Sequence, residues 1–305
     1  KLSVDIVHAH SVWTYPTFCS ARLARVFDVP FFLTPRSSLY QVSMRKSFVK
    51  KKLVRWGYLD RLLNAGAYVH ATESREMHEV MEQWPGASVF CAQNGVNAIH
   101  IGGRSKVNDR RAFGIEASTR VFLFLGRVHP RKNIELTIRA FAQLIRGGEN
   151  AVLLVAGAFS SSSYERVVRR LVAELDIVNQ VVFAGHVSGD LKCAAYSAAD
   201  VFILVSKFEN FGVSVAEALS AGLPVIVSNN MPWGAVDKKG CGVTVSVART
   251  DEVFSAMRVY LRSTDQQLEL MGRLGIDLSK KYTWEAQASV VASHYKSSLR
   301  ALQRG

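Results

Sequence analysis

Cysteine is scarce in this 305-residue chain, and its four cysteines are far apart, at Cys19, Cys91, Cys193 and Cys241. No two of them form a C-x-x-C pair, so neither a disulfide framework nor a zinc site with the usual spacing is indicated. The pattern is typical of a reduced, cytosolic protein with incidental buried thiols.

Long apolar runs are also missing, and no stretch approaches the about 18 to 20 residues that span a bilayer. The 21 glycines and 7 prolines occur without a period, which excludes collagen-like and low-complexity classes. Intrinsic disorder is excluded because 49% of the residues are hydrophobic and only 21% are charged. The apolar residues come as short β-branched runs, as in buried parallel strands.

Acidic residues are few relative to basic ones, 25 against 38, which gives a formal net charge of +13. The excess is concentrated in residues 36–61, where Asp60 is the single acid among eight basic residues: Arg36, Arg45, Lys46, Lys50, Lys51, Lys52, Arg55 and Arg61. Such a run is most often a solvated helix face. Here aromatic and aliphatic residues alternate with the cations, as in helices that lie on anionic membranes, so we expect residues 45–61 to contact a membrane surface.

A nucleic-acid partner is not expected. The sequence contains no zinc-finger spacing, no RNP-like aromatic motif and no helix-turn-helix signature. The chain begins with Lys and has no signal peptide at its start, so we expect it to be a fragment or a natural truncation.

Strand-like and helix-like runs alternate from one end of the chain to the other. The expected strands cover residues 4–8, 31–34, 68–71, 89–91, 121–125, 152–156, 181–184, 201–205, 224–227 and 243–247. This alternation predicts βαβ units, and hence α/β structure with helices on both faces of parallel sheets. Ten strands exceed an ordinary open sheet, so we divide the chain in residues 94–120, where periodicity lapses.

The prediction is therefore two doubly wound, Rossmann-like parallel-sheet domains that face a cleft. The first covers residues 1–97, the second covers 98–281, and a helix over 282–305 packs back on the first domain. In sheets of this kind ligands bind beyond the carboxyl ends of the strands, so the residues after each strand are the candidates for a site.

The loop after residues 121–125 carries two cations. Gly126 permits a tight turn there, and Arg127 and Lys132 follow before the next helix. Positive charge at a helix N-terminus opposes the helix dipole unless an anion lies between. Taken alone, this loop favours phosphate binding only slightly over a basic surface loop.

The loop after residues 201–205 carries two carboxylates around a glycine. Gly212 allows backbone N–H groups to approach a ligand where the next helix opens, with Glu209 before it and Glu217 about one turn into the helix. Two carboxylates around such N–H groups suit a ligand with hydroxyl-rich ends and a diphosphate centre. The alternative is a capping acid plus an ordinary helix Glu, but Glu217 lies among apolar neighbours, where an unpartnered carboxylate is costly.

Together these motifs resemble the retaining glycosyltransferases of family 4, which have the GT-B fold. The resemblance lies in the E-x7-E spacing of Glu209 and Glu217, the G-R-x4-K spacing from Gly126 to Lys132, and the run Glu217-Ala-Leu-Ser-Ala-Gly-Leu-Pro-Val-Ile. It extends through residues 4–10, 94–97, 231–233 and 240–242, and so covers nearly the whole chain.

The resemblance implies that Arg127 and Lys132 hold the diphosphate of a nucleotide-sugar donor. Glu209 would contact the transferred sugar and Glu217 the ribose hydroxyls. Two loops would border phosphate, sugar and nucleobase: Asn210, Phe211, Gly212 and Val213 in one, and Gly185, His186 and Val187 in the other. Arg127, Lys132 and Glu209 are the predicted catalytic residues. Because protein cations would neutralise the leaving group and the sequence has no D-x-D, neither a metal nor another cofactor is expected.

Two features depart from the family pattern. A histidine that many members carry in the first domain is replaced here by Thr34-Pro35-Arg36, which leaves Arg36 and His10 as acceptor-side candidates. For Arg36 a surface position is an equal alternative, and a lone histidine such as His10 is more often structural. The family's first domain also begins with further β/α units, so the resemblance implies an incomplete first domain. Its strand at residues 4–8 would then expose a sheet edge, open to a second copy or a partner chain.

The expected function is transfer of a sugar, with retention, from a nucleotide-diphosphate-sugar to a glycan or lipid-linked acceptor. This reaction would serve polysaccharide or glycolipid biosynthesis. The protein would be bound peripherally at the cytoplasmic face of a membrane. The alternative is a catalytically impaired subunit that binds nucleotide sugar and acts with a partner glycosyltransferase. A nonhydrolysing sugar-nucleotide epimerase shares the GT-B architecture, but the first domain has no corresponding set of acidic and basic residues.

Overall fold

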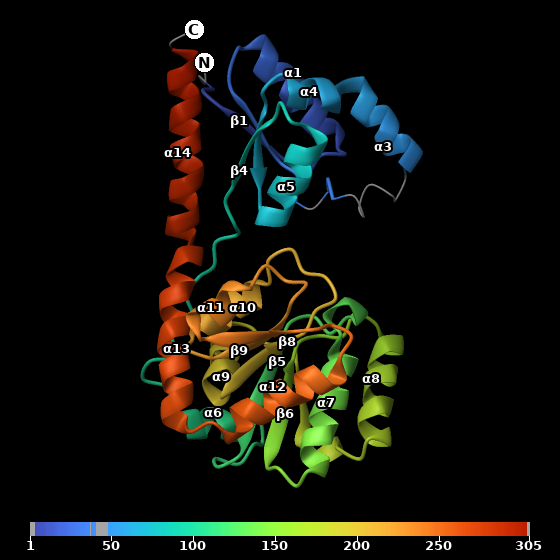
Figure 1. Ribbon diagram of the computed structural model, residues 1–305, viewed down its shortest axis with the longest axis vertical. Helices are drawn as coiled ribbons and strands as arrows, with labels where there is room; N and C mark the ends of the chain where they lie inside the picture. Colours follow the sequence, from blue (N-terminus) through green and yellow to red (C-terminus); the bar gives the residue numbers. More distant parts are fainter. Residues whose placement is uncertain (1–3, 37, 41–47, 304–305) are drawn as a thin grey trace. The chain divides into compact units, whose positions relative to one another are not determined.

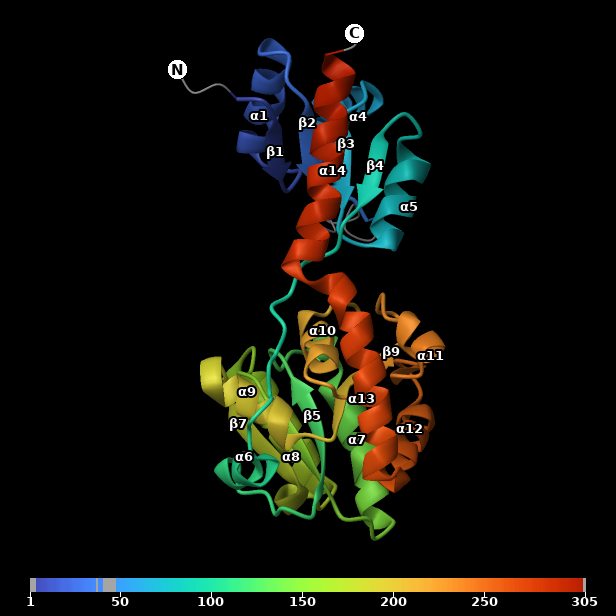
Figure 2. The ribbon, with the colours of Figure 1, turned by 90° about the vertical axis from the view of Figure 1, so that its left-hand side faces the viewer.

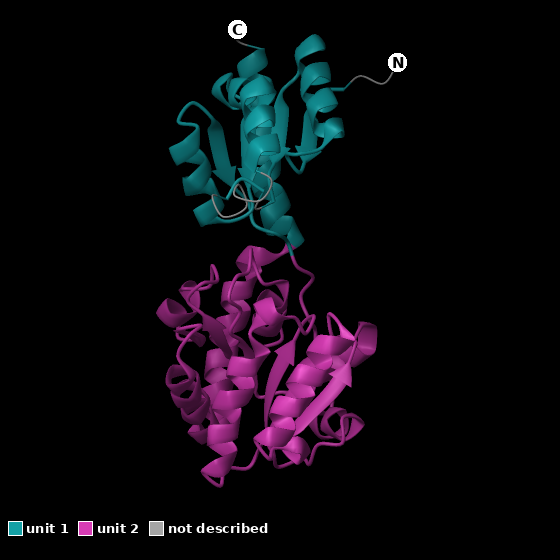
Figure 3. Cartoon of the chain, turned by 90° about the vertical axis from the view of Figure 1, so that its right-hand side faces the viewer, with its two compact units in different colours: residues 1–95, 284–305 teal, residues 96–283 magenta. Residues whose placement is uncertain are grey.

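The computed structural model describes residues 4–36, 38–40 and 48–303, and the chain divides into two units (Figure 3). Unit 1 comprises residues 1–95 and 284–305, and unit 2 comprises residues 96–283. The domain boundaries predicted from the sequence lie between residues 97 and 98 and between residues 281 and 282. Each unit is built on a parallel sheet, of four strands in unit 1 and six in unit 2. Arg45 and Lys46 of the predicted membrane segment lie outside the described residues.

Unit 1 is a sheet with helices on both faces. Its strands follow the order β1-β2-β3-β4: β1 (Val7–His10), β2 (Phe31–Thr34), β3 (Tyr68–Ala71) and β4 (Ser88–Cys91). One face packs against helices α1 (Tyr15–Val26), α4 (Asp60–Asn64) and α5 (Ser74–Gln83), through residues such as Ala24, Leu63 and Val80. The other face packs against α14 (Trp284–Leu302), where Phe32 and Phe90 meet Val290, Val291 and Tyr295 (Figure 2).

The first strand begins three residues later than predicted. Pairing starts with Val7 opposite Phe31, the first residue of β2, where the Val7 N–H donates to the Pro30 carbonyl at 3.0 Å. Pro30 has no N–H of its own with which to extend the ladder toward residues 4–6. Val4 is accordingly 54% exposed. His10 is therefore the last residue of β1 and does not follow the strand as expected. β1 pairs with β2 alone in the described part of the chain, so it is an edge strand of this sheet.

The basic stretch forms a continuous helical segment where it is described. Helix α3 (Phe48–Val54) leads into a π-helical turn η1 (Arg55–Leu59) and then into α4. Leu59 and Leu63 are its fully buried anchors to the sheet, whereas Phe48, Val49, Leu53 and Trp56 are exposed. Among the described residues no helix combines the length and apolar character needed to cross a bilayer.

Unit 2 is a doubly wound sheet with strand order β10-β9-β8-β5-β6-β7, all parallel. The strands are β5 (Arg120–Leu125), β6 (Ala151–Ala156), β7 (Val181–Gly185), β8 (Val201–Leu204), β9 (Val225–Ser228) and β10 (Gly242–Val245). Most of the residues in β5, β6, β8 and β9 are buried, as expected for strands that are covered on both faces.

The helices of unit 2 lie on both faces of this sheet (Figure 1). On one face α7 packs against α8 and α12, and on the other α9 packs against α6 and α10 against α13. The helices are α6 (Lys106–Ala112), α7 (Ile134–Arg146), α8 (Ser162–Glu174), α9 (Gly189–Ala198), α10 (Val213–Ser220), α11 (Ala235–Lys239), α12 (Thr250–Arg262) and α13 (Asp265–Ser279). The sequence did not indicate α6, a short helix in the segment where periodicity lapses. Ser105 caps this helix, because its side-chain oxygen accepts from the backbone N–H of Asn108.

A buried carboxylate fastens α6 to the amino ends of the central strands. The side chain of Asp200, directly before β8, is 5% exposed and accepts from Arg110 Nη2 and Lys106 Nζ, both at 2.6 Å. It also accepts from the backbone N–H of Val121 at 2.7 Å. Because Arg110 is itself buried, this carboxylate is the counter-charge of a cation that water does not reach.

We predict that Asp200→Asn lowers the free energy of unfolding of unit 2 by about 3–5 kcal/mol, because it leaves a buried cation uncompensated. Urea unfolding followed by circular dichroism measures the change. Asp265→Asn is the matched control: Asp265 also contacts a cation, Arg120 at 3.0 Å, but its side chain is 84% exposed. Equal, small losses in both variants would contradict the assignment.

Candidate functional site

The strand order of unit 2 reverses between β5 and β8. These two strands pair directly, at Phe122 with Val201 and Leu123 with Phe202. From this point the chain runs outward through β6 and β7 on one side and through β9 and β10 on the other. The loops that leave β5 and β8 must diverge there, and such a switch point is where doubly wound sheets bind ligands.

The two loops at this switch point are joined by their own contacts. The backbone N–H of Lys207 donates to the Arg131 carbonyl at 2.8 Å. The Lys132 ammonium forms an ion pair with the Glu209 carboxylate, and both side chains are about four-fifths buried, with 22% and 20% exposed. The structure therefore brings together a predicted phosphate ligand and a predicted sugar ligand from segments 77 residues apart.

Glycines make the close approach of backbone possible at this edge of the sheet. A Cβ on Gly157, directly after β6, would lie 1.9 Å from the carbonyl oxygen of Gly126, directly after β5. Any side chain at that position would force the two strand ends apart. Asn133 then starts α7 from a left-handed conformation, with φ +56°, and its side-chain amide donates to the Val247 carbonyl at 3.0 Å.

The segment before α10 is held from behind by aromatic packing. Gly212 caps this helix in a left-handed conformation, φ +84°, and a Cβ there would lie 2.7 Å from the Met231 side chain. The Phe211 ring packs against Trp233 and Tyr282, with centroids 5.2 and 5.5 Å away. The Trp233 indole also donates to the Phe211 carbonyl. The Met-Pro-Trp segment thus supports the backbone that leads into the helix.

Glu217 is buried on α10, and the structure shows the partners that its burial requires. Lys192 Nζ lies 2.6 Å from one carboxylate oxygen, and the Tyr196 hydroxyl donates to the other at 2.9 Å. Burial and the adjacent carboxylate raise the pKa of Tyr196 well above its usual value. Sequence reasoning missed both partners. Their spacing of four residues places both on one face of the helix that follows residues 185–187, but no pattern in the sequence joins that face to α10.

The remaining predicted donor-side residues lie on the loops as the sequence places them. Arg127 is exposed, and within the described ranges it has no acidic side chain in ion-pair distance. His186 and Val213 are exposed, whereas Val187 is buried and Asn210 is partly buried. Gly185 ends β7 in a left-handed conformation, φ +68°, which turns the chain toward α9.

The two acceptor-side candidates lie together in unit 1. His10 ends β1, and Arg36 follows β2 with a left-handed backbone, φ +50°. Arg36 Nη2 lies 3.5 Å from His10 Nδ1, and both side chains are exposed. His10 also stacks on His8, with ring centroids 4.7 Å apart.

His8 starts a hydrogen-bonded chain that crosses the sheet. Its Nε2 lies 2.6 Å from the Thr34 hydroxyl, which lies 3.0 Å from Nδ1 of His70. On the other side Nδ1 of His8 hydrogen-bonds the Tyr295 hydroxyl of α14. Burial, with the positive groups His10, His70 and Arg36 nearby, lowers the pKa of His8 to about 4. In the described residues no His, Cys, Asp and Glu side chains gather in a group of three that could hold a metal ion.

We predict that acid weakens unit 1 through His8. Its pKa is depressed in the folded state, so its contribution to stability is complete above the ordinary value of 6.5 and is lost as the pH falls toward about 4. Amide hydrogen exchange at residues 7–10, corrected for intrinsic rates, should become faster as the pH is lowered from 7 to about 5. His8→Gln should reduce this acid sensitivity, and an unchanged sensitivity in that variant would contradict the role of His8.

Comparison with known proteins gives a family and a fold. Residues 105–263, which are 159 of the 305, match the family described as glycosyl transferases group 1. An uncharacterized glycosyltransferase of Methanocaldococcus jannaschii, MJ1607, is 26% identical over 306 residues, which covers 98% of this chain and 77% of that protein. A D-inositol 3-phosphate glycosyltransferase of Segniliparus rotundus is 28% identical over 198 residues, which covers 64% of this chain and 44% of that protein.

Among solved structures, Alr3699/HepE of Anabaena in complex with UDP-glucose superimposes on this chain with a TM-score of 0.76. Its sequence is 17% identical, and the match covers 96% of this chain and 79% of that one. This likeness confirms the predicted fold, two parallel α/β units of the GT-B type. The chain spans less than two thirds of the Segniliparus relative, of which it covers 44%.

Proposed function

Since the chain belongs to the glycosyl transferases group 1 family, we propose that it transfers a sugar, with retention, from a nucleotide-diphosphate-sugar to a glycan or lipid-linked acceptor. The observation that carries this proposal is the Lys132–Glu209 pair at the switch point of unit 2. An ammonium and a carboxylate in contact there suit a donor whose phosphate and sugar are joined by the bond to be broken. The products would serve polysaccharide or glycolipid biosynthesis.

The diphosphate is assigned to Arg127, Lys132 and the N-terminus of α10. Lys132 has three N–H donors, and its bond to Glu209 leaves donors for phosphate oxygens. Arg127 is exposed, and in the described structure no acid neutralises it. Helix α10 begins directly after Gly212, so the N–H groups of its first two residues, Val213 and Ser214, have no carbonyl partner within the helix, whereas the N–H of Val215 donates to the Gly212 carbonyl. Glu209, next to Lys132, is then placed to accept hydroxyl hydrogen bonds from the sugar on the far side of the scissile bond.

The reaction that these groups support is electrostatic. As the bond between the sugar and the diphosphate breaks, negative charge grows on the diphosphate, and Arg127, Lys132 and the helix N–H groups stabilise it. The acceptor hydroxyl attacks the sugar from the face that the diphosphate leaves, which retains the configuration, and its proton passes to the departing diphosphate oxygen. With protein cations in this role, the proposed step uses no metal.

The nucleoside is assigned to the neighbouring loop and to Glu217. Lys192 and Tyr196 each occupy one lone pair of the Glu217 oxygens, which leaves acceptor capacity for two ribose hydroxyls. Residues 185–187 lead directly into α9, the helix that carries these two side chains. A base against this loop would therefore adjoin a ribose at Glu217.

The acceptor side and the partners belong to unit 1. We assign the acceptor to His10 and Arg36, and a peripheral contact with an anionic membrane at the cytoplasmic face to residues 45–61, of which Lys50, Lys51 and Lys52 are described on α3. The open edge of β1 is the place for a second copy or a partner chain. No nucleic-acid contact forms part of the proposal.

Calorimetric titration of nucleotide sugars tests the donor assignment. Charged hydrogen bonds to phosphate contribute about 1.5–3 kcal/mol each, so Lys132→Ala should weaken nucleotide diphosphate binding by roughly 10- to 100-fold and leave nucleoside binding nearly unchanged. Equal losses for nucleoside and diphosphate would refute the assignment. In the wild type, binding with sugar transfer or slow donor hydrolysis supports the transferase. Binding without turnover would favour a nucleotide-sugar-binding subunit that acts with a partner enzyme.

Kinetic and binding measurements should distinguish the roles of the two carboxylates, Glu209 and Glu217. Glu209→Gln should lower the transfer rate far more than the affinity for bare nucleotide diphosphate, because it removes the sugar contact and an anion beside the phosphate site. Glu217→Gln should weaken the binding of nucleotide and nucleoside together. If Glu209→Gln lowered nucleotide affinity and left the transfer rate intact, the two roles would be reversed.

A further inference from the structure

Unit 1 contains a groove that the proposed reaction does not use. It lies between α1 and the η1–α4 segment, where β2 and β3 begin, at the strand ends opposite to His10 and Thr34. Its volume is about 750 Å³, within the range of roughly 300–1,000 Å³ that is usual for small-molecule sites. Its walls and floor are mainly apolar, with Phe18, Ala21, Phe31, Leu62, Ala65 and Tyr68 among them.

Small side chains keep this groove open. Ala21 and Ala24 face it from α1, and Gly57 and Ala65 face it from the opposite segment. A Cβ on Gly57 would meet nothing within 4 Å, so space remains there even for a side chain. The hydroxyl of Tyr58, which also lines the groove, is turned to the Val12 carbonyl at 2.9 Å. Apart from its arginine side chains, the groove therefore presents a mainly apolar surface.

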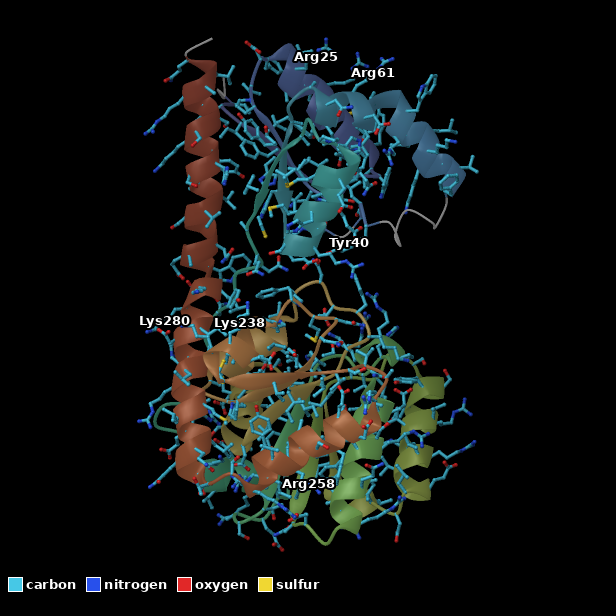
Figure 4. All side chains as sticks on the ribbon, viewed as in Figure 1. Arg25, Tyr40, Arg61, Lys238, Arg258 and Lys280 are labelled. Carbon is cyan, nitrogen blue, oxygen red and sulfur yellow. The ribbon has the colours of Figure 1, made fainter. Side chains whose placement is uncertain are left out.

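Three arginines line the same groove without acidic partners. Arg22 and Arg25 lie on one face of α1, and Arg61 lies on α4; Figure 4 labels Arg25 and Arg61 on these neighbouring helices. All three are exposed, and among the described residues none has a carboxylate within ion-pair distance. The nearby Asp60 is already bound to Arg55 at 3.0 Å. Like charges gathered in this way repel one another until an anion lies between them.

Exposed apolar side chains adjoin residues of the groove in the sequence. Val26 and Phe27, which follow Arg25 at the end of α1, are 75% and 67% exposed, and Trp56, which precedes Gly57 in η1, is 77% exposed. Exposed apolar side chains beside unpaired cations mark a surface that enters the interface of an anionic membrane. A soluble phosphate would satisfy the arginines but would leave the apolar walls uncovered.

We propose that this groove binds one anionic phospholipid drawn from a bilayer. An acyl chain lies along the apolar walls, and Arg22, Arg25 and Arg61 hold the phosphate. The proposal goes beyond the charged contact assigned to residues 45–61, since it requires a single lipid in a defined groove. It is independent of the donor chemistry of unit 2, so the two can fail separately.

The test is calorimetric titration of the full chain with monomeric dioctanoylphosphatidylglycerol. Dioctanoylphosphatidylcholine and glycerol phosphate are the comparison ligands, because the first lacks the net charge and the second lacks the chains. Replacing Arg22, Arg25 and Arg61 together with Gln should weaken binding by about 10- to 100-fold, as expected for loss of charged hydrogen bonds. Ala65→Trp should weaken it by at least about ten-fold without changing any charge, because the indole fills the groove.

Two variants serve as matched controls. Replacing Arg139, Arg166 and Arg170 of unit 2 with Gln removes the same three charges from exposed positions and should change binding less than about two-fold. Replacing Lys50, Lys51 and Lys52 with Gln should weaken association with phosphatidylglycerol vesicles but spare the binding of monomeric lipid, which separates the groove from the basic segment.

Several outcomes would overturn the proposal. Equal losses in the two arginine triples would reduce the effect to net charge, and glycerol phosphate binding as tightly as the lipid would make the groove a site for soluble phosphate. A concentration-dependent dimer abolished by Ala65→Trp would assign the groove to a second copy. If the groove triple fails to fold, Ala65→Trp decides alone, provided its amide exchange in β1–β4 matches the wild type; unchanged lipid binding in that variant would refute the proposal.

Discussion

The direct pairing of β5 with β8 is the constraint on which the candidate site depends. It places the two strands side by side although 75 residues lie between Leu125, where β5 ends, and Val201, where β8 begins. The loops that leave the two strands therefore meet. Gly126 and Gly157 allow the neighbouring strand ends to approach, while Trp233 and Tyr282 hold the second loop from behind. The Lys132–Glu209 pair is a consequence of this backbone arrangement. Its two side chains could not meet if the strand order reversed elsewhere.

Much of this arrangement could be predicted, because it is encoded in short-range patterns. Alternating β-branched runs and helical stretches identified the parallel sheets, and glycines with charged residues after the runs 121–125 and 201–205 identified the loops at the switch point. Local patterns work here since a strand, its following loop and the next helix are contiguous in the chain.

Other features could not be predicted, because they join residues that are distant in sequence. The need of Glu217 for a partner could be argued from its apolar neighbours, but Lys192 and Tyr196 become visible only when α9 packs beside α10. The network around Asp200 spans 90 residues to Arg110, and it depends on α6, a helix too short to produce a periodic signal. The start of β1 depended on where β2 begins, which the sequence of β1 alone does not contain. The apolar groove of unit 1 arises from small residues on two separate helices, and such residues show no pattern until the helices face each other.

Unit 1 is made of two segments that flank unit 2 in the sequence, and this has a consequence for the order in which the two units fold. The strands of its sheet lie between Val7 and Cys91, but the helix over one face of that sheet, α14, follows unit 2 in the sequence. The bond between His8 and Tyr295 joins residues 287 positions apart. During synthesis on the ribosome, Phe32 and Phe90 therefore remain uncovered until the whole of unit 2 has emerged. Unit 2 is contiguous and can fold as soon as it is complete, ahead of the unit that precedes it in sequence. The sheet of unit 1 is thus completed only after unit 2 has been made, and loss of α14 would leave that sheet with one bare aromatic face.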